Sequence, residues 1–204
     1  SSDADGIIKV HERLVSNFLS KIPLNKAAKA YVPEKSYLDF LEPHRNNYYF
    51  VRTDLKNFFH SISGELLVDS FSPYFSEGNS EDFKKQKILN AFINLVSYTV
   101  PDNSANKTFS NKLILPMGFK TSPVISNIVF RKIDILIEDY CSQHNIIYTR
   151  YADDMLFSSK TNSEKIVDPI AELFNQNIKK KIEFIHSERF INELSILVNI
   201  GKFK

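Results

Sequence analysis

The chain has 204 residues, a formal net charge of +2, 43% hydrophobic residues and 13% aromatic residues. This composition excludes a disordered chain and predicts a globular protein large enough to bury a core. The near-neutral charge gives little support to a strongly basic nucleic-acid-binding domain. The single cysteine, Cys141, excludes an internal disulfide and favours a reducing, cytoplasmic location. No signal peptide is recognisable and no apolar run approaches the about 18 residues of a membrane span, so we expect no membrane partner.

The spacing of hydrophobic residues predicts the secondary structure in chain order. The predicted helices are residues 7–22, 65–75, 81–98, 123–141 and 163–180. The predicted strands are residues 48–54, 113–115, 148–151, 155–157, 182–185 and 195–200. Strands and helices that alternate in this way indicate a compact α+β fold.

Three aspartates stand at the ends of predicted strands. Asp54 ends the strand 48–54, while Asp153 and Asp154 lie between two strands that can pair as a hairpin. Taken singly, each has a plain structural explanation, as a solvated turn or as a helix cap. Taken together, converging carboxylates repel one another and raise their pKa values, and divalent cations with oxygen ligands relieve that repulsion. Two such ions about 4 Å apart can catalyse in-line phosphoryl displacement.

Three segments of the sequence resemble the central palm motifs of reverse transcriptases. These segments are VRTDLKNFFHSI, LPMGFKTSPVISN and YTRYADD, and their order and spacing are those of the family. The similarity is greatest to bacterial retron, group II intron and phage-defence enzymes. The upstream segment AKAYVPEKSYLDFLEPH resembles the fingers of retron-type enzymes.

The resemblance covers about residues 20–200 and implies a right-hand polymerase fold, in which an antiparallel sheet packs on helices. The implied domains are fingers at residues 1–48 and 64–118 and palm at residues 49–63 and 119–204. Too few residues follow Asp154 for a helical thumb. We therefore expect a thumb-containing region or partner subunit, and weak, salt-dependent nucleic-acid binding by the isolated chain.

The resemblance also implies the metal-binding and nucleotide-binding residues. Asp54 and Asp153 match the metal ligands, Leu55 adds a backbone carbonyl, and Asp154 supports metal binding at two Mg²⁺ ions, with Mn²⁺ as a possible substitute. Phe59 matches the aromatic floor that excludes a ribose 2′-hydroxyl, although an ordinary core ring is the alternative. The other positions implied to contact the nucleotide are Lys35, Met117, Gly118 and Arg189. Template or primer contact is implied for Pro116, Thr121, Ser122, Pro123, Asn127 and Tyr151.

Two of these positions depart from the family pattern. Met117 stands where glutamine is usual, and a thioether is a weak acceptor that donates no hydrogen bond. Arg189 stands where lysine is usual; it can hold pyrophosphate, but it is a poor proton donor. For Lys35, where arginine is common, an ordinary surface lysine remains the alternative.

The function implied is RNA-templated DNA synthesis from dNTPs at a primer 3′-hydroxyl, in a bacterial retron or an anti-phage defence system. The partners would be an RNA template and a DNA or RNA primer. One alternative is template-independent or protein-primed DNA polymerisation by a defence-associated relative, which the Met117 substitution leaves open. Another is a non-catalytic RNA-binding palm subunit, which three retained aspartates disfavour. A generic metal-dependent nuclease does not account for Phe59 or the motif around Gly118.

Overall fold

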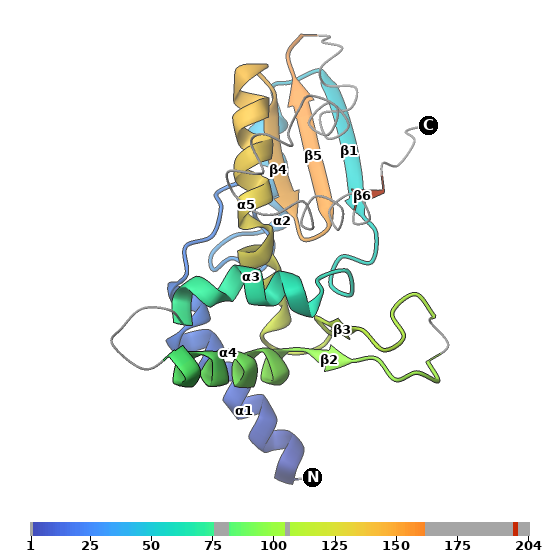
Figure 1. The fold of residues 1–204 in the computed structure, drawn as a ribbon. Helices are drawn as coiled ribbons and strands as arrows, with labels where there is room; N and C mark the ends of the chain where they lie inside the picture. Colours follow the sequence, from blue (N-terminus) through green and yellow to red (C-terminus); the bar gives the residue numbers. More distant parts are fainter. Residues whose placement is uncertain (1, 76–81, 105–106, 162–197, 200–204) are drawn as a thin grey trace. The chain divides into compact units, whose positions relative to one another are not determined.

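The computed structural model describes residues 2–75, 82–104, 107–161 and 198–199 (Figure 1). These residues form two compact units. The helical unit comprises Ser1–Pro23 and Phe59–Val129, and the sheet unit comprises Leu24–Phe58 and Phe130–Lys204. The predicted helix 163–180, the predicted strand 182–185 and Arg189 lie outside the described residues.

The sheet unit is built on a four-stranded sheet with the strand order β4-β5-β1-β6 (Figure 1). Its strands are β1 (Tyr49–Leu55), β4 (Ile147–Tyr151), β5 (Asp154–Ser159) and β6 (Val198–Asn199). Every neighbouring pair is antiparallel. The predicted strand 48–54 and the predicted hairpin around the aspartate pair are therefore confirmed.

One face of this sheet packs on α5 (Ser122–Gln143), whose residues from Phe130 onward belong to the sheet unit. The register places Tyr148 and Arg150 of β4 on this face, opposite Phe157 and Met155 of β5. Phe157 and Met155 are completely buried. This apolar face holds the helix and sheet together, because burying such side chains is the main favourable contribution to folding.

The opposite face is covered by α2 (Tyr37–Leu41) and the 3₁₀ helix η2 (Glu42–His44). The Thr149 hydroxyl donates a hydrogen bond of 2.8 Å to the Phe40 carbonyl. The buried His44 lies 2.7 Å from the same hydroxyl through its Nε2 atom. Burial lowers the His44 pKa to about 4, so this imidazole is neutral at physiological pH. These polar contacts fix α2 over the sheet face that also carries the acidic residues.

The helical unit contains four α-helical segments, one 3₁₀ helix and a two-stranded ribbon among its described residues. They are α1 (Ser2–Asn17), η1 (Leu19–Lys21), α3 (Gly64–Phe75), α4 (Asp82–Val96), β2 (Tyr98–Thr99), β3 (Leu113–Ile114) and the first part of α5. Rings from α3, α4 and the turn between α1 and η1 pack together in this unit, with Phe92 at centroid distances of 4.8 Å from Phe71 and 5.9 Å from Phe18.

The helices of this unit agree with the predicted ones to within a few residues, except near the N-terminus. The predicted helix 7–22 is observed as α1 followed by the separate turn η1, since the α-helix ends at Asn17. Gly64 begins α3 where a β-carbon would lie 2.6 Å from the Leu113 side chain, so only glycine allows this approach. No helix in the described part of the chain is long and apolar enough to span a bilayer.

Candidate active site

The hairpin between β4 and β5 turns through Ala152 and Asp153, with Tyr151 and Asp154 as the last paired residues. We call residues 151–154 the acidic turn. Ala152 has a φ of +59°, whereas Asp153 keeps a negative φ, which is the φ pattern of a type II′ turn. That first position strongly favours glycine, so alanine stores backbone strain there. Such strain persists only where surrounding contacts hold the turn in place.

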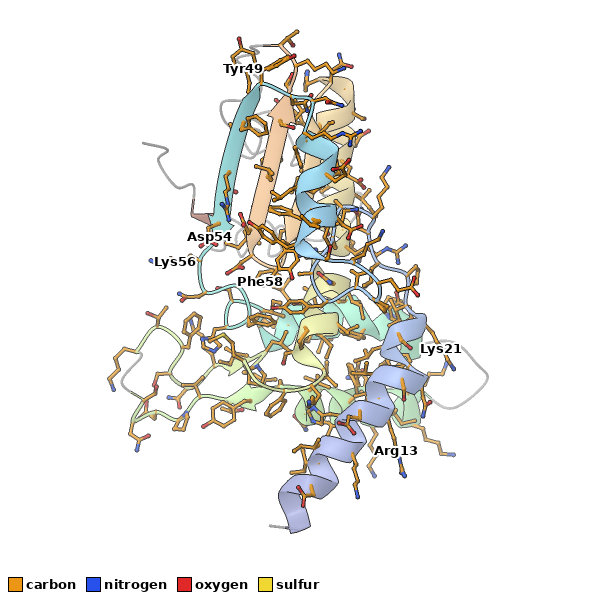
Figure 2. All side chains as sticks on the ribbon, turned by 180° about the vertical axis from the view of Figure 1, so that it is seen from behind. Arg13, Lys21, Tyr49, Asp54, Lys56 and Phe58 are labelled. Atoms are coloured by element: carbon orange, nitrogen blue, oxygen red, sulfur yellow. The ribbon has the colours of Figure 1, made fainter. Side chains whose placement is uncertain are left out.

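Asp54 lies beside this turn because β1 and β5 are neighbours. Asp54 and Asp154 are direct partners in the antiparallel register, so their Cα atoms are about 4.5–5.5 Å apart. The Leu55 amide donates a hydrogen bond of 2.9 Å to the Asp153 carbonyl, which ties the turn to the end of β1. Figure 2 shows Asp54 at this end of β1, where the chain leaves the strand towards Lys56 and Phe58. The fold thus gathers the three aspartates at one sheet end.

The three carboxylates influence one another electrostatically. Partial burial raises the pKa of Asp54, and the negative charges of Asp153 and Asp154 raise it further. The Arg52 guanidinium acts in the opposite direction. The repulsion that the sequence predicted is therefore present at Asp54, and a nearby cation would relieve it.

Arg52 forms a two-point ion pair with Asp154. It lies two residues before Asp54 on β1, so both side chains face the same side of the sheet. Its Nε atom donates a hydrogen bond of 2.8 Å to one carboxylate oxygen of Asp154, and a terminal nitrogen donates to the other. The same guanidinium lies 3.4 Å from the Tyr37 hydroxyl. Asp154 is consequently neutralised by a side chain of its own chain.

The other oxygen donors at this end of the sheet are of a chemical kind that divalent cations accept, and their role as ligands stays a prediction. Asp54, Asp153 and the carbonyl of Leu55 are hard ligands of the kind that Mg²⁺ and Mn²⁺ accept. Among the described residues, no group of three or more His, Cys, Asp or Glu side chains is arranged as a ready metal site. Of the three aspartates, Asp154 is the one that pairs with Arg52 within the described part of the chain.

A second arginine fixes the acidic turn from the other face of the sheet. Arg150 is completely buried, and its guanidinium donates to both oxygens of Asp134 on α5, at 2.9 and 2.6 Å. A third donor reaches the Ala152 carbonyl at 2.9 Å. The Tyr148 hydroxyl also donates to Asp134 at 2.7 Å. The strained residue of the turn is therefore attached directly to a buried charge network.

Aromatic side chains surround the turn on its α2 side. The ring of Tyr37 lies 5.1 Å from that of Tyr151, and the ring of Phe40 lies 5.9 Å from it. Tyr31 is exposed over 44% of its surface, and its pKa is raised by burial and by the negative charge of Asp153.

The sequence interpretation included Tyr151 but missed Tyr31, Tyr37 and both arginines. An arginine before each acidic segment was the signal that could have drawn attention to them.

Lys35 belongs to the sheet unit, where its ammonium group lies 3.2 Å from Asp39. Asp39 accepts hydrogen bonds from the backbone and side chain of Ser36 in a capping box, and these bonds lower its pKa to about 2. Lys35 is therefore occupied by a local helix-start contact. Its proposed contact with a nucleotide stays a prediction.

The other sequence-predicted nucleotide and template residues within the described chain lie in the helical unit, apart from the acidic turn itself. Gly118 has a φ of +96°, a value that favours glycine, and a β-carbon there would meet nothing within 4 Å. The backbone conformation, rather than crowding by the chain, therefore explains this glycine. The neighbouring Met117 is 67% exposed, and Phe59 is half-buried.

The motif that follows Gly118 is mostly buried. The Ser122 hydroxyl donates a hydrogen bond of 2.6 Å to the Pro116 carbonyl, and the Thr121 hydroxyl lies 3.2 Å from His11 Nδ1. Asn127 is also buried, whereas Pro123 is half-buried. These contacts hold the start of α5 to the loop before it. Template or primer binding by these residues stays a prediction.

Comparison with known proteins identifies the family of the chain and several similar proteins. A family model for "Reverse transcriptase (RNA-dependent DNA polymerase)" matches residues 5–189. The chain is 32% identical over 175 residues to the retron Ec83 reverse transcriptase of Escherichia coli, covering 85% of this chain and 51% of that protein. It is 30% identical over 172 residues to the retron Ec73 reverse transcriptase of the same species, covering 82% and 50%.

Among solved structures, apo telomerase from Candida tropicalis, truncated from its C-terminal domain, matches with a TM-score of 0.44 and 13% identity, over 88% of this chain and 38% of that one. The chain spans about half the length of the two retron relatives. The extent of the family match decides the classification: this chain belongs to the reverse transcriptase family.

Proposed function

We propose that this chain carries the catalytic carboxylates of a retron-type reverse transcriptase, which copies an RNA template into DNA from dNTPs. One observation carries the proposal. Asp54 and the acidic turn, which occupy two separate family motifs, are brought together as direct neighbours at one end of the sheet. The raised pKa of Asp54 supports it, since such a site is suited to cations. A retron or anti-phage role and a cytoplasmic location belong to the same proposal.

The family generally uses divalent metal ions, and we take Mg²⁺ as the ion here. Asp54, Asp153 and the Leu55 carbonyl would hold it. When bound, such ions activate an attacking hydroxyl and stabilise the leaving oxygen of a phosphoryl transfer. Pyrophosphate leaves as the primer 3′-hydroxyl becomes bonded to the α-phosphate of the incoming nucleotide.

The protein residues contribute position and charge. Arg150 holds the Ala152 carbonyl, so the turn presents Asp153 with little freedom to move. Asp134 in turn fixes Arg150 through both of its oxygens. Rigid placement of this kind matters because reacting groups must be held close to their productive geometry. The primer, the template and the remaining part of the enzyme complete this proposal as its partners.

The proposal is tested with the full-length enzyme, Mg²⁺, labelled dNTPs and a primed RNA, with and without the template. Asp54→Asn and Asp153→Asn should each reduce incorporation by about 100-fold or more, the scale of losing a key electrostatic group. Asp139→Asn is the matched control, because Asp139 is an exposed carboxylate of α5 in the same unit. It should retain full activity.

The products separate the competing functions. Extension that follows the template sequence supports RNA-templated synthesis, whereas products that ignore the template indicate template-independent or protein-primed synthesis. RNA binding without any incorporation would indicate a non-catalytic palm subunit. Activity that survives in both Asn variants would refute the carboxylate site itself.

The sugar preference provides a separate test of Phe59. A large ring at the sugar position clashes with a 2′-hydroxyl, so Phe59→Val should increase ribonucleotide incorporation relative to dNTP use. Phe58→Val is the neighbouring control, because Phe58 is buried and lies 5.8 Å, centroid to centroid, from Phe130 in the core of the sheet unit. If discrimination is unchanged in Phe59→Val, Phe59 is an ordinary packing residue.

A further inference from the structure

Arg52, Asp54 and Asp154 lie on the same face at one end of the sheet, and Asp153 lies in the turn beside them. Arg52 and Asp54 are two residues apart on β1, and Asp154 is the direct cross-strand partner of Asp54. Arg52 is therefore the diagonal neighbour of Asp154, within reach of a long side chain. Both oxygens of Asp154 accept hydrogen bonds from this one guanidinium. A planar fork of this kind matches a carboxylate in geometry as well as in charge.

The two partners differ in how much they are exposed to solvent. The Arg52 side chain is 55% exposed, whereas that of Asp154 is 16% exposed. An exposed guanidinium has water as an alternative hydrogen-bond partner, so this pair is easier to open than a completely buried one. The Tyr37 hydroxyl, 3.4 Å from the guanidinium, gives Arg52 a further contact on the α2 side. Arg52 can therefore release Asp154 without disturbing the packed face of the sheet.

This pairing changes the charge that an incoming cation meets. Three converging carboxylates would offer three negative charges, but the guanidinium cancels that of Asp154. Affinity for divalent ions in oxygen-ligand sites rises with the number of charged ligands. An incoming cation therefore meets the negative charges of Asp54 and Asp153, while Asp154 stays paired with Arg52.

We propose that Arg52 is a positioning residue that holds Asp154 away from the divalent-ion site and thereby limits the affinity of the site. The inference rests on the proposed function, because it assumes that Asp54 and Asp153 bind the ion. It adds that ion binding and the Arg52–Asp154 pair compete for one carboxylate. Asp154 can therefore bind an ion only when its pair with Arg52 breaks and the Arg52 side chain moves into solvent.

The test measures Mn²⁺ binding to the full-length protein without nucleotide or nucleic acid, from the loss of the electron paramagnetic resonance signal of free Mn²⁺. Arg52→Gln should tighten binding by about tenfold, because it releases one carboxylate to the ion. Arg52→Lys keeps the positive charge but not the fork, so its affinity should lie between those of the wild type and Arg52→Gln. Arg45→Gln is the control; Arg45 is 67% exposed and pairs with Glu42 instead, so affinity should stay the same.

A double-mutant cycle with Asp154→Asn identifies the mechanism. If Arg52 acts by holding Asp154, Arg52→Gln should change Mn²⁺ affinity less than about threefold in the Asp154→Asn background, because an unpaired guanidinium extends into water and is screened. An equal gain in both backgrounds would overturn the inference, since Arg52 would then act on the ion through space. Unchanged or weaker binding in Arg52→Gln would overturn it as well.

Asp54→Asn separates this inference from the function on which it rests. If Asp54→Asn weakens Mn²⁺ binding but Arg52→Gln has no effect, the ion site exists and only the role of Arg52 is wrong. If Asp54→Asn binds Mn²⁺ as the wild type does, the ion lies elsewhere and both proposals fail. Circular dichroism and the denaturation midpoint of each variant show whether the protein is folded.

Discussion

Two arginine–aspartate forks flank the acidic turn, one on each face of the sheet. Arg150 and Asp134 are both completely buried, whereas the Arg52 side chain of the other fork is more than half exposed. Both guanidiniums bind both oxygens of their partner. The two pairs have the same hydrogen-bonding groups, so they differ only in their exposure to solvent and in the residues around them.

That difference assigns each fork a different task. The buried guanidinium also stacks 4.6 Å from the Phe130 ring centroid and bonds the Ala152 carbonyl, so it has no alternative partner in water. The exposed guanidinium of Arg52 has water as an alternative partner to its carboxylate. The buried Arg150–Asp134 pair holds the acidic turn in one position, whereas Arg52 and Asp154 can change partners. This combination suits a site in which Asp153 is held rigidly and Asp154 exchanges Arg52 for another ligand.

The largest expected effect comes from breaking the buried fork. Arg150→Met should destabilise the protein by about 3–5 kcal/mol, because it leaves the Asp134 carboxylate buried without its cation. Urea denaturation followed by circular dichroism measures the change. Arg52→Gln is the matched comparison and should cost less than about 1 kcal/mol. Similar losses in the two variants would show that exposure does not distinguish the forks.

A double replacement sharpens the first prediction. Arg150→Met combined with Asp134→Leu removes both charges and fills the space with apolar atoms, so it should recover much of the stability lost in Arg150→Met alone. Polymerisation should not recover with it, because the Ala152 carbonyl still lacks its donor. Recovery of full activity together with stability would show that the bond to the turn has no positioning role.

The next effect in size concerns the hydroxyl that completes the buried network. Tyr148→Phe removes the 2.7 Å hydrogen bond to Asp134 without changing the shape of the ring. The cost should be about 1.5–3 kcal/mol, the range for hydrogen bonds to charged groups. Thermal unfolding measures it, with Tyr49→Phe as the control, since Tyr49 lies at the far, exposed end of β1 (Figure 2). Equal stability of the Tyr148→Phe variant and the wild type would exclude this contribution.

Local sequence patterns predicted the strands on which the three aspartates lie. Strand-forming residues before Asp54 predicted β1, and two strand-like runs around Asp153 predicted the hairpin; both are observed. The same hairpin made the convergence of the carboxylates a reasonable expectation. Helical spacing of apolar residues likewise predicted α5, which is observed at Ser122–Gln143.

The supporting contacts were not predictable, because they depend on register and tertiary packing. Arg52 reaches Asp154 across a sequence separation of 102 residues, and only the β1–β5 register brings the two together. Asp134 is one of several charged residues on α5, and the sequence alone does not identify it as the partner of Arg150 in β4. The left-handed backbone of Ala152 has no signal in its residue type, since glycine is the residue expected there.

A smaller effect is expected at the turn itself. Ala152→Gly removes the strain of a positive φ, so it should stabilise the protein by up to about 1 kcal/mol, less the entropy that glycine gains in the unfolded chain. The same change frees the turn, so polymerisation should decrease although stability rises. Denaturation midpoints and incorporation rates are measured on the same samples. A loss of stability would mean that the contacts around Ala152, rather than its backbone angle, dominate.

The smallest effect concerns the charge of Asp54. A carboxyl whose pKa is raised in the folded state favours folding when protonated, so its contribution falls as the pH rises from the unfolded value through the folded value. Asp54→Asn should therefore stabilise the metal-free protein at pH 7 by less than about 1 kcal/mol, because Asp54 is exposed and solvent screens the repulsion. The gain should disappear below about pH 4, where the wild-type carboxyl is protonated as well.

Added Mg²⁺ should stabilise the wild type and not Asp54→Asn, since an ion bound to the folded state alone shifts the equilibrium towards it. Denaturation at pH 3.5 and pH 7, with and without Mg²⁺, checks each step, and equal stabilities of variant and wild type under all these conditions would mean that Asp54 is not repelled by the turn.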